Sequence, residues 1–200
     1  MKEVQKVNDV CKLLFQDACK NILQQDREEN FLILIADSVL QQGMNYKNFV
    51  LPRLMHIRTY FCNIHCISQL STSLEDIENI LQVKNKRKVN TFKNIIELFQ
   101  KENIETYSDI VRWLSDKNNF CKLLEINGFG VKTLDYMLNL FGYQNIPIDR
   151  HLFSFLQICT ISTNNYQYAS KIFNNVADRN NFCKIAFDKE IWNYVRNIRI

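Results

Sequence analysis

The sequence predicts an all-α fold, and three observations support this. Apolar residues recur at intervals of three and four over residues 3–24, as on one face of a helix. The apolar run over residues 31–40 has mixed propensity, but the segments around it show helical patterns. Gly128 and Gly130 are two of only four glycines, so backbone freedom is concentrated at one tight turn between two helical segments.

In chain order, residues 3–24 are expected to form an amphipathic helix, and the polar residues 24–30 are expected to form a loop. Residues 31–40 are predicted to be a buried helix rather than a strand. A further helix is expected over residues 45–64. Pro52 would kink or interrupt it, because a proline inside a helix removes a hydrogen bond.

The next helix begins at a capping-box pattern, in which Ser71 or Ser73 is the expected N-cap. Residues 117–126 and 133–141 are the expected arms of a helical hairpin, and Gly142 is a natural residue to end the second arm. Other helices are predicted at residues 106–114, 150–160, 168–177, 178–187 and 188–195.

Composition places few limits on function. A hydrophobic content of 46% with 23% charged residues is ordinary for a globular protein, and 200 residues can bury a substantial core. No segment approaches the roughly 18 uninterrupted apolar residues of a transmembrane helix, and residues 1–6 lack the apolar core of a signal peptide. The net charge of +4 and the pI near 8.6 are compatible with nucleic-acid binding but do not require it.

The cysteines indicate reduced thiols. They number seven, an odd count at irregular spacing, which favours an intracellular protein over a disulfide framework. Cys62 and Cys66, with His65 between them, have the one spacing that hints at a metal site. Two thiols fall short of the four ligands of a structural zinc, so buried thiols are the favoured interpretation.

The turn between Gly128 and Gly130 has the pattern of a phosphate site. A short Gly-x-Gly turn that enters a helix leaves several amide N–H groups unpaired, and the helix dipole adds positive potential there. Lys132 lies in the first turn of the helix that follows. The same field favours a neutral, nucleophilic amine at this position.

Residues 127–133 (Asn-Gly-Phe-Gly-Val-Lys-Thr) and 146–151 (Ile-Pro-Ile-Asp-Arg-His) resemble the helix-hairpin-helix plus Gly/Pro-Asp signature of the endonuclease III superfamily of DNA glycosylases. The resemblance implies that Lys132 attacks the sugar and that Asp149 assists it, as in the members that also cleave the DNA strand. It covers about residues 30–160 well and implies two helical lobes, with the active site in the cleft between them.

The resemblance also implies where the lobes divide. The central lobe is expected to span residues 25–145, with the hairpin at about residues 118–142. Residues 1–24 would fold back and join residues 146–200 in the second lobe. The two catalytic residues would then face each other across the cleft.

Both catalytic residues have simpler explanations. Gly-x-Gly-x-Lys hairpins also occur in non-catalytic DNA-binding modules, and Asp149 could equally be an ordinary helix N-cap. Three departures from the family pattern are also present. The 17 positions between Lys132 and Asp149 are slightly few, Asn127 replaces the usual proline, and Leu134 replaces the usual small residue. The ordered combination of the two motifs favours catalysis.

A polar side chain that enters the DNA stack is implied at the end of the helix over residues 31–40. In the superfamily, a glutamine or similar residue there fills the space of the extruded base and bonds the orphaned partner base. Gln42 matches this position best, with Gln41 as its neighbour. The alternative is that both are surface residues at a helix end.

Phosphate contacts are expected from the hairpin amides, from the basic run over residues 83–93 and from a histidine beside Asp149. A basic run is usually only a solvated face, but in this superfamily some cations before the hairpin lie near the DNA backbone. The candidates are Gly128, Gly130, Val131, Lys84, Lys86, Arg87, Lys88 and His151.

Two segments resemble archaeal-type (type 2) 8-oxoguanine glycosylases in particular: residues 141–153 and residues 187–196, a short C-terminus with an acidic residue and a tryptophan. The resemblance implies that Asp188 and Trp192 contact the excised base, although Trp192 could simply belong to the core. A preference for oxidised pyrimidines stays open, as do a non-catalytic DNA-binding protein and a protein-interaction scaffold on a glycosylase fold.

The implied partner is double-stranded DNA that contains a damaged base. The protein is expected to bind it as a monomer, and no association with a membrane is expected. Many superfamily relatives hold an iron–sulfur cluster with four C-terminal cysteines, but here only Cys159 and Cys183 follow the hairpin. No cluster is therefore expected, and the chemistry requires no redox cofactor. Such hairpins sometimes hold a K⁺ or Na⁺ through main-chain carbonyls, and this stays open.

Overall fold

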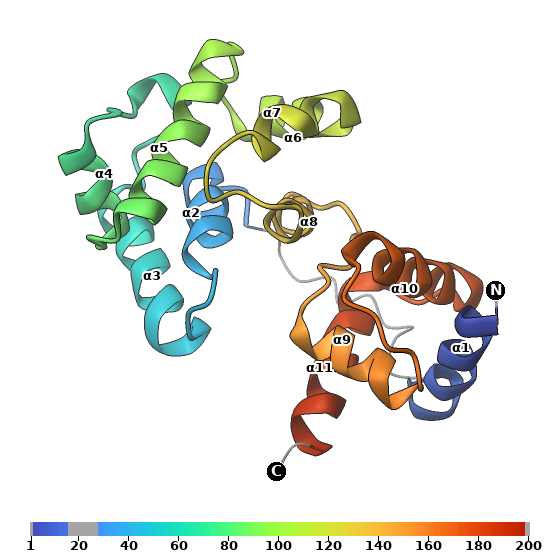
Figure 1. Ribbon diagram of the computed structural model, residues 1–200. Helices are drawn as coiled ribbons and strands as arrows, with labels where there is room; N and C mark the ends of the chain where they lie inside the picture. The colour runs from blue at the N-terminus through green and yellow to red at the C-terminus, as the bar shows by residue number, and fades with distance from the viewer. Residues whose placement is uncertain (1, 16–27, 199–200) are drawn as a thin grey trace. The chain divides into compact units, whose positions relative to one another are not determined.

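The computed structural model describes residues 2–15 and 28–198, and this part of the chain is built from helices without a strand (Figure 1). The predicted all-α class is confirmed. The chain forms two compact units, one of Arg27–Phe141 and one of Met1–Asp26 with Gly142–Ile200. None of the described helices has both the length and the apolar surface that a membrane crossing requires.

The unit Arg27–Phe141 contains the hairpin and the helices that support it. Its elements are α2 (Phe31–Leu40), the π-helical turn η1 (Tyr46–Val50), α3 (Leu51–Tyr60), the short 3₁₀ turn η2 (Ile67–Gln69), α4 (Leu74–Leu81), α5 (Lys86–Lys101), α6 (Tyr107–Ser115), a second 3₁₀ turn η3 (Lys117–Asn119), α7 (Phe120–Leu124) and α8 (Val131–Leu140).

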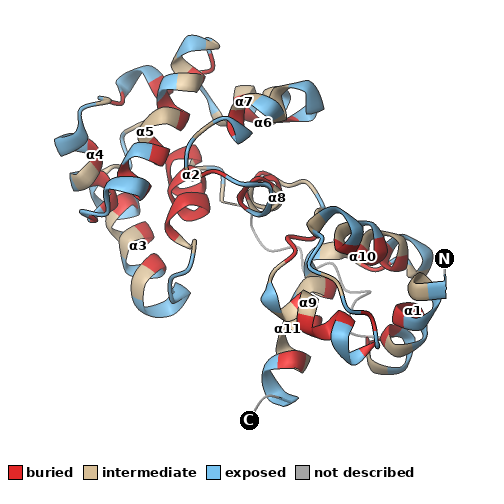
Figure 2. Ribbon diagram, viewed as in Figure 1, coloured by how far each residue is buried: buried red, intermediate tan, exposed pale blue. Residues whose placement is uncertain are grey.

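Helix α2 is the centre of this unit. All ten of its residues are buried, and it packs against α3, α5 and α8 (Figure 2). A helix that is apolar on every side is stable only where other elements surround it. Asn30 begins the helix by accepting hydrogen bonds from the amides of Leu32 and Ile33. The prediction of a buried helix rather than a strand is confirmed.

The helix expected over residues 45–64 is shorter and divided. Asn45 caps the π-helical turn η1, and α3 follows directly and ends at Tyr60. Pro52 lies in the first turn of α3, directly after η1, and the amide of Leu51 donates to Tyr46 O. The helix is thus interrupted beside Pro52, as predicted, and residues 61–66 form a loop.

Side-chain caps fix where several other helices begin. Ser73 rather than Ser71 caps α4, with its Oγ accepting from the amide of Asp76 at 3.2 Å. Thr106 caps α6 in the same way through Asp109, and Asn85 caps α5 through Lys88. Each such cap contributes about 1 kcal/mol, so short polar residues set the register of these helices.

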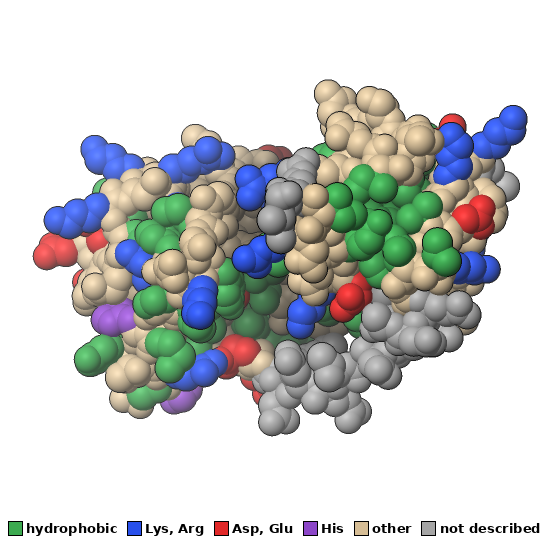
Figure 3. All heavy atoms as spheres, turned by 90° about the horizontal axis from the view of Figure 1, so that it is seen from below, with side chains coloured by type: hydrophobic (Ala, Val, Ile, Leu, Met, Phe, Trp, Pro, Cys, Tyr) green, Lys and Arg blue, Asp and Glu red, His purple; other side chains and the backbone are tan. Residues whose placement is uncertain are grey.

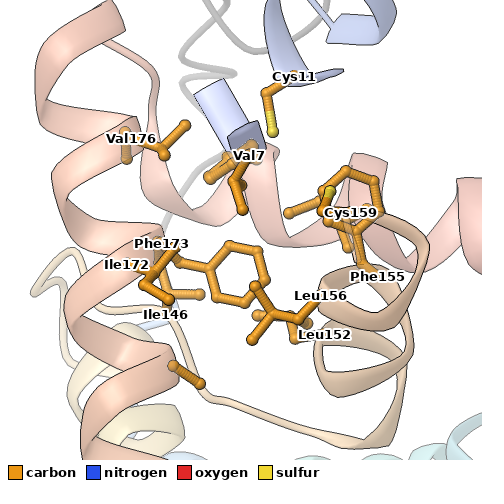
Figure 4. Packing of buried hydrophobic residues seen from close by; sticks show 14 of the residues in the cluster. Val7, Cys11, Ile146, Leu152, Phe155, Leu156, Cys159, Ile172, Phe173 and Val176 are labelled. Atoms are coloured by element: carbon orange, nitrogen blue, oxygen red, sulfur yellow. The ribbon is translucent and has the colours of Figure 1, made fainter. Parts of the chain in front are cut away.

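The second unit is described for α1 (Lys2–Phe15), α9 (Arg150–Ile158), α10 (Tyr166–Asn180) and α11 (Lys184–Ile198). Helix α1 packs on α10, and α9 packs on α11. Figure 4 shows Phe155 and Phe173 in the shared core, with Val7 and Cys11 reaching it from α1. The predicted N-terminal helix is confirmed to Phe15, and its expected continuation to residue 24 lies outside the described residues.

Two predicted helix boundaries near the C-terminus are wrong. Helix α10 continues past Ala177 to Asn180, and Asn181 then ends it in the left-handed conformation with φ of 53°. Helix α11 runs without a break through Asp188. Residues 178–181 are polar, and several of them are exposed on the last turn of α10. Their polar composition therefore indicated a turn before the helix actually ends.

Candidate active site

The hairpin turn joins α7 to α8 by a short run of main-chain hydrogen bonds. The amide of Ile126 donates to Leu123 O at 3.1 Å, and the amide of Phe129 donates to Ile126 O at 2.9 Å. Phe129 is buried and anchors the turn, whereas Gly128 has a φ of +91° that favours glycine. Gly130 is the N-cap of α8, and no side chain caps the first amides of that helix. These amides are therefore available to an anion.

Thr91 of α5 holds this turn in place, and the sequence analysis did not identify it. Its Oγ1 lies 2.8 Å from both Asn127 O and Arg87 O. A Cβ at Gly128 would lie only 2.3 Å from Thr91 Oγ1, so the turn can approach α5 only without a side chain there. At Gly130 an added Cβ would meet no atom within 4 Å. The two glycines therefore have different roles: Gly128 allows the turn to pack against α5, and Gly130 leaves open space at the start of α8.

Lys132 and Val131 lie in the first turn of α8, and both are exposed. Thr133, the next residue, is buried, and its Oγ1 accepts a hydrogen bond from Gln42 Nε2 at 3.1 Å. Gln42 and Gln41 are both half-buried at the end of α2. The structure thus brings the predicted DNA-inserting glutamine next to the helix turn that carries the predicted nucleophile.

Lys88 must be removed from the predicted phosphate contacts. Its side chain is buried, and its Nζ donates to Val39 O, Leu40 O and Gln42 O at 3.0, 2.9 and 3.0 Å. All three ammonium protons are used, so none is left for a phosphate. Burial lowers the pKa of Lys88 to about 8, and the nearby Arg87 guanidinium acts in the same direction.

The other three cations predicted to contact phosphate are exposed. Lys84, Lys86 and Arg87 lie at or just before the start of α5. Arg87 also lies beside the hairpin, because a Cβ at Gly128 would be 3.2 Å from its Nε. On the face of the unit Arg27–Phe141 that is seen at the left of Figure 3, Lys and Arg side chains are spread among apolar and neutral ones rather than gathered in one patch. Arg87 is the cation that the structure places at the predicted phosphate site.

A buried carboxylate near the same helix was missed by the sequence analysis. Asp37 of α2 accepts hydrogen bonds from Tyr46 Oη at 3.2 Å and from Tyr136 Oη at 3.3 Å. Burial raises the pKa of Asp37 to about 6, although the two hydroxyls oppose this by stabilising the ionised form. Burial and the neighbouring carboxylate raise the pKa of Tyr46 to about 12. Tyr136 follows Lys132 by one turn of α8, so this cluster supports the helix that carries the lysine.

Asp149 is the N-cap of α9. Its Oδ1 accepts from the amides of His151 and Leu152 at 2.7 and 3.1 Å, and its Oδ2 lies 3.1 Å from His151 Nδ1. The N-cap interpretation is therefore correct, and both oxygens have defined partners. Asp149 is half-buried, so its carboxylate is held in one orientation while it still reaches the surface.

Three predicted site residues meet at this end of α9. The rings of His151 and Trp192 are 5.3 Å apart between centroids, and the Arg196 guanidinium lies 5.1 Å from the Trp192 ring. Trp192 is half-buried rather than part of the closed core, and Asp188 precedes it by one turn of α11. The structure thus groups Trp192 with His151 and its partner Asp149, and it adds Arg196, which the sequence analysis missed.

Comparison with known proteins identifies the fold. No protein-family model matches the sequence, and no curated protein matches it. The 8-oxoguanine DNA glycosylase of Thermotoga maritima is 16% identical, with a TM-score of 0.57 over 97% of this chain and 94% of its own. The 8-oxoguanine glycosylase/lyase of Methanocaldococcus jannaschii, solved with a 15mer DNA containing 8-oxoguanine, is 19% identical, with a TM-score of 0.58 over 98% of both chains. The chain has the fold of these glycosylases.

This glycosylase fold confirms the predicted resemblance, while the roles of individual residues stay predictions. Lys132 belongs to the unit Arg27–Phe141, and Asp149 belongs to the other unit. At the hairpin, Ile126 O and Asn127 O accept from Phe129 and Thr91. A K⁺ or Na⁺ at main-chain carbonyls of the hairpin stays open as well.

The prediction of buried thiols is wrong for Cys62 and Cys66. Cys62 is exposed and Cys66 is half-buried, because α3 ends at Tyr60 and both residues follow it rather than lying within a helix. Cys66 Sγ lies 3.3 Å from Ser68 Oγ. Among the residues that the structure describes, no group of three or more His, Cys, Asp or Glu side chains could hold a metal ion.

We expect Gly128→Ala to destabilise the protein more than Gly130→Ala. The first change adds a Cβ at positive φ against Thr91, which should lower the free energy of unfolding by about 2 kcal/mol or more. The second change meets open space and replaces glycine at an N-cap, which should cost about 1 kcal/mol or less. Urea unfolding of the two variants measures the difference, and equal losses would contradict the packing role of Gly128.

We expect Asp37→Asn to change how stability depends on pH. The pKa of Asp37 is raised from 3.8 to about 6, so the folded state binds the extra proton and wild-type stability falls as pH rises between these values. The variant should lack this fall and gain up to about 3 kcal/mol relative to wild type at pH 7. An asparagine can keep both tyrosine hydrogen bonds, with one reversed. Urea unfolding at pH 4, 5, 6 and 7 measures this, and parallel curves for the two proteins would contradict it.

Proposed function

We propose that this protein is a DNA glycosylase with lyase activity that removes an oxidised base, with 8-oxoguanine favoured, from duplex DNA. The observation that carries the proposal is the exposed Lys132 in the first turn of α8, directly after a glycine turn packed on α5. It occurs in a chain that shares its fold with two proteins described as 8-oxoguanine glycosylases. A lysine at the mouth of an anion site suits attack on a sugar next to a phosphate.

Binding comes first in the proposed mechanism. The enzyme extrudes the damaged nucleotide, at a cost of a few kcal/mol, and Gln42 fills the space left in the stack. The uncapped amides at the start of α8 bind a backbone phosphate near the lesion, and Arg87 adds a positive charge beside them. These contacts would fix the sugar within reach of Lys132.

The chemical steps then follow from an amine nucleophile. The neutral amine of Lys132 attacks the sugar C1′, and the glycosidic bond breaks with its electron pair leaving on the base, which takes up a proton. The sugar ring opens to give a Schiff base between Lys132 and C1′. Loss of a proton from C2′ then expels the 3′ phosphate, which cleaves the strand. Asp149 would stabilise the positive charge on the sugar and the amine during the attack.

Contacts to the damaged base are proposed for the unit that contains Gly142–Ile200. Asp188 and Trp192 are the proposed base contacts, because an aromatic face and a carboxylate can stack on and hydrogen-bond a flipped purine. Trp192 is half-buried beside His151, which leaves part of its ring accessible. The partner would be double-stranded DNA bound by a monomer inside the cell, without an iron–sulfur cluster.

We expect borohydride to trap a covalent complex of the wild-type protein with a duplex that contains 8-oxoguanine. Duplexes with thymine glycol or without damage serve as comparisons, and an adduct on thymine glycol alone would indicate an oxidised-pyrimidine enzyme. Lys132→Ala should give no adduct, because the Schiff base needs its amine. The exposed Lys101→Ala serves as a matched control. Intact duplex binding with no adduct on any lesion would favour a non-catalytic DNA-binding protein.

Asp149→Asn separates the two roles of that residue. Asparagine caps a helix about as well as aspartate, so the melting temperature should stay nearly unchanged. The single-turnover rate of base excision should fall roughly 100-fold or more, because the variant cannot stabilise positive charge in the transition state. An unchanged rate in a folded variant would reduce Asp149 to a cap.

A further inference from the structure

Lys88 has an unusual environment for a residue of a basic run. Its side chain is 7% exposed, and its ammonium donates to three main-chain carbonyls at the end of α2: Val39 O, Leu40 O and Gln42 O. The remaining carbonyl of this stretch, Gln41 O, accepts from the amide of Met44 at 3.1 Å. Every carbonyl from residue 39 to residue 42 therefore has a partner, and Lys88 supplies three of the four bonds.

A buried ammonium is costly unless it is fully hydrogen-bonded, and the C-terminal end of a helix is a favourable place for it. Helix α2 is buried along its whole length, so water cannot readily satisfy its last carbonyls. The positive charge of Lys88 meets the negative end of the α2 dipole there. The arrangement fixes the direction in which the chain leaves α2, and that direction sets where Gln42 lies.

Gln42 is held at both ends as a result. Its main-chain oxygen accepts from Lys88 Nζ at 3.0 Å, and its side-chain Nε2 donates to Thr133 Oγ1 at 3.1 Å. Thr133 is the residue after Lys132 on α8. One short chain of contacts thus runs from α5 through the end of α2 to the first turn of α8.

We propose that Lys88 is a positioning residue that sets Gln42 for entry into the duplex, in register with Lys132. This inference rests on the proposed glycosylase function. Lys88 does not touch the DNA; it acts through the main chain of Gln42. Loss of its ammonium would leave three carbonyls without their donor, and the turn over residues 41–44 would lose its fixed path. Removal of a stacked base would suffer most, because that step requires the vacated space to be filled.

Hydrogen exchange in the free protein tests the structural half of the proposal. Lys88→Met keeps the length and apolar stem of the side chain but has no donors, and Lys101→Met changes an exposed lysine at the other end of the same helix. We expect amides of residues 41–44 to exchange roughly tenfold faster or more in Lys88→Met and unchanged in Lys101→Met. Unchanged protection of this turn in Lys88→Met would overturn the proposal.

Single-turnover rates test the functional half. Lys88→Met should slow the release of 8-oxoguanine roughly tenfold to 100-fold, as a small misplacement of a positioning group does. Cleavage of the same duplex with a base-free site at the lesion should change much less, because no base has to leave the stack. An equal loss on both duplexes would indicate general damage to the fold and overturn the positioning role, as would no loss on either.

A second variant guards against a failure of Lys88→Met to fold. Thr133→Val removes the hydrogen bond that anchors the Gln42 side chain, while Lys88 keeps its burial and its charge. Like Lys88→Met, it should slow release of 8-oxoguanine more than cleavage at the base-free site, but by a smaller factor. If Thr133→Val lowered the rate by the same factor on both duplexes, the result would count against the proposal. A wild type that acts on neither duplex overturns the glycosylase function itself, while hydrogen exchange still decides whether Lys88 orders the turn.

Discussion

The fold of the unit Arg27–Phe141 depends on the buried ammonium of Lys88. Helix α2 is enclosed by α3, α5 and α8, and a helix end inside a protein needs donors for its last carbonyls. Water could serve an exposed end, but here one lysine serves three carbonyls. Because the same lysine belongs to α5, the central helix and the helix that supports the hairpin are joined at one point.

Helix α5 therefore acts as a platform for both parts of the candidate site. Lys88 holds the end of α2 that carries Gln42, and Thr91, three residues later, holds the hairpin turn at Asn127. Residues three apart on a helix lie on the same side, so the two contacts face the same region. The relative position of the glutamine and Lys132 is then set by one rigid helix and not by two independent loops.

Local patterns predicted much of the fold, while the site needed contacts that cross the chain. A cap at Ser71 or Ser73 and the buried helix over residues 31–40 were predicted because caps and periodicity are visible within a few residues. Asp37 was missed because its partners Tyr46 and Tyr136 lie 9 and 99 positions away in other elements. Lys88 was grouped with its basic neighbours by composition alone. It shares a face of α5 with Phe92, four positions later, and this helical spacing would have separated it from Lys86 and Arg87.

The structural role of Asp149 as a helix cap and its proposed catalytic role need not compete. The cap uses Oδ1, which accepts from two amides, while Oδ2 faces His151 Nδ1. A carboxylate held by two amide donors and by contact with the His151 ring cannot rotate freely, so its orientation is fixed before any substrate arrives. The ring of His151 is itself packed against Trp192, which limits its movement in turn. Capping thus supplies the preorganisation that electrostatic stabilisation of a transition state requires, and the simple interpretation of this residue strengthens the catalytic one.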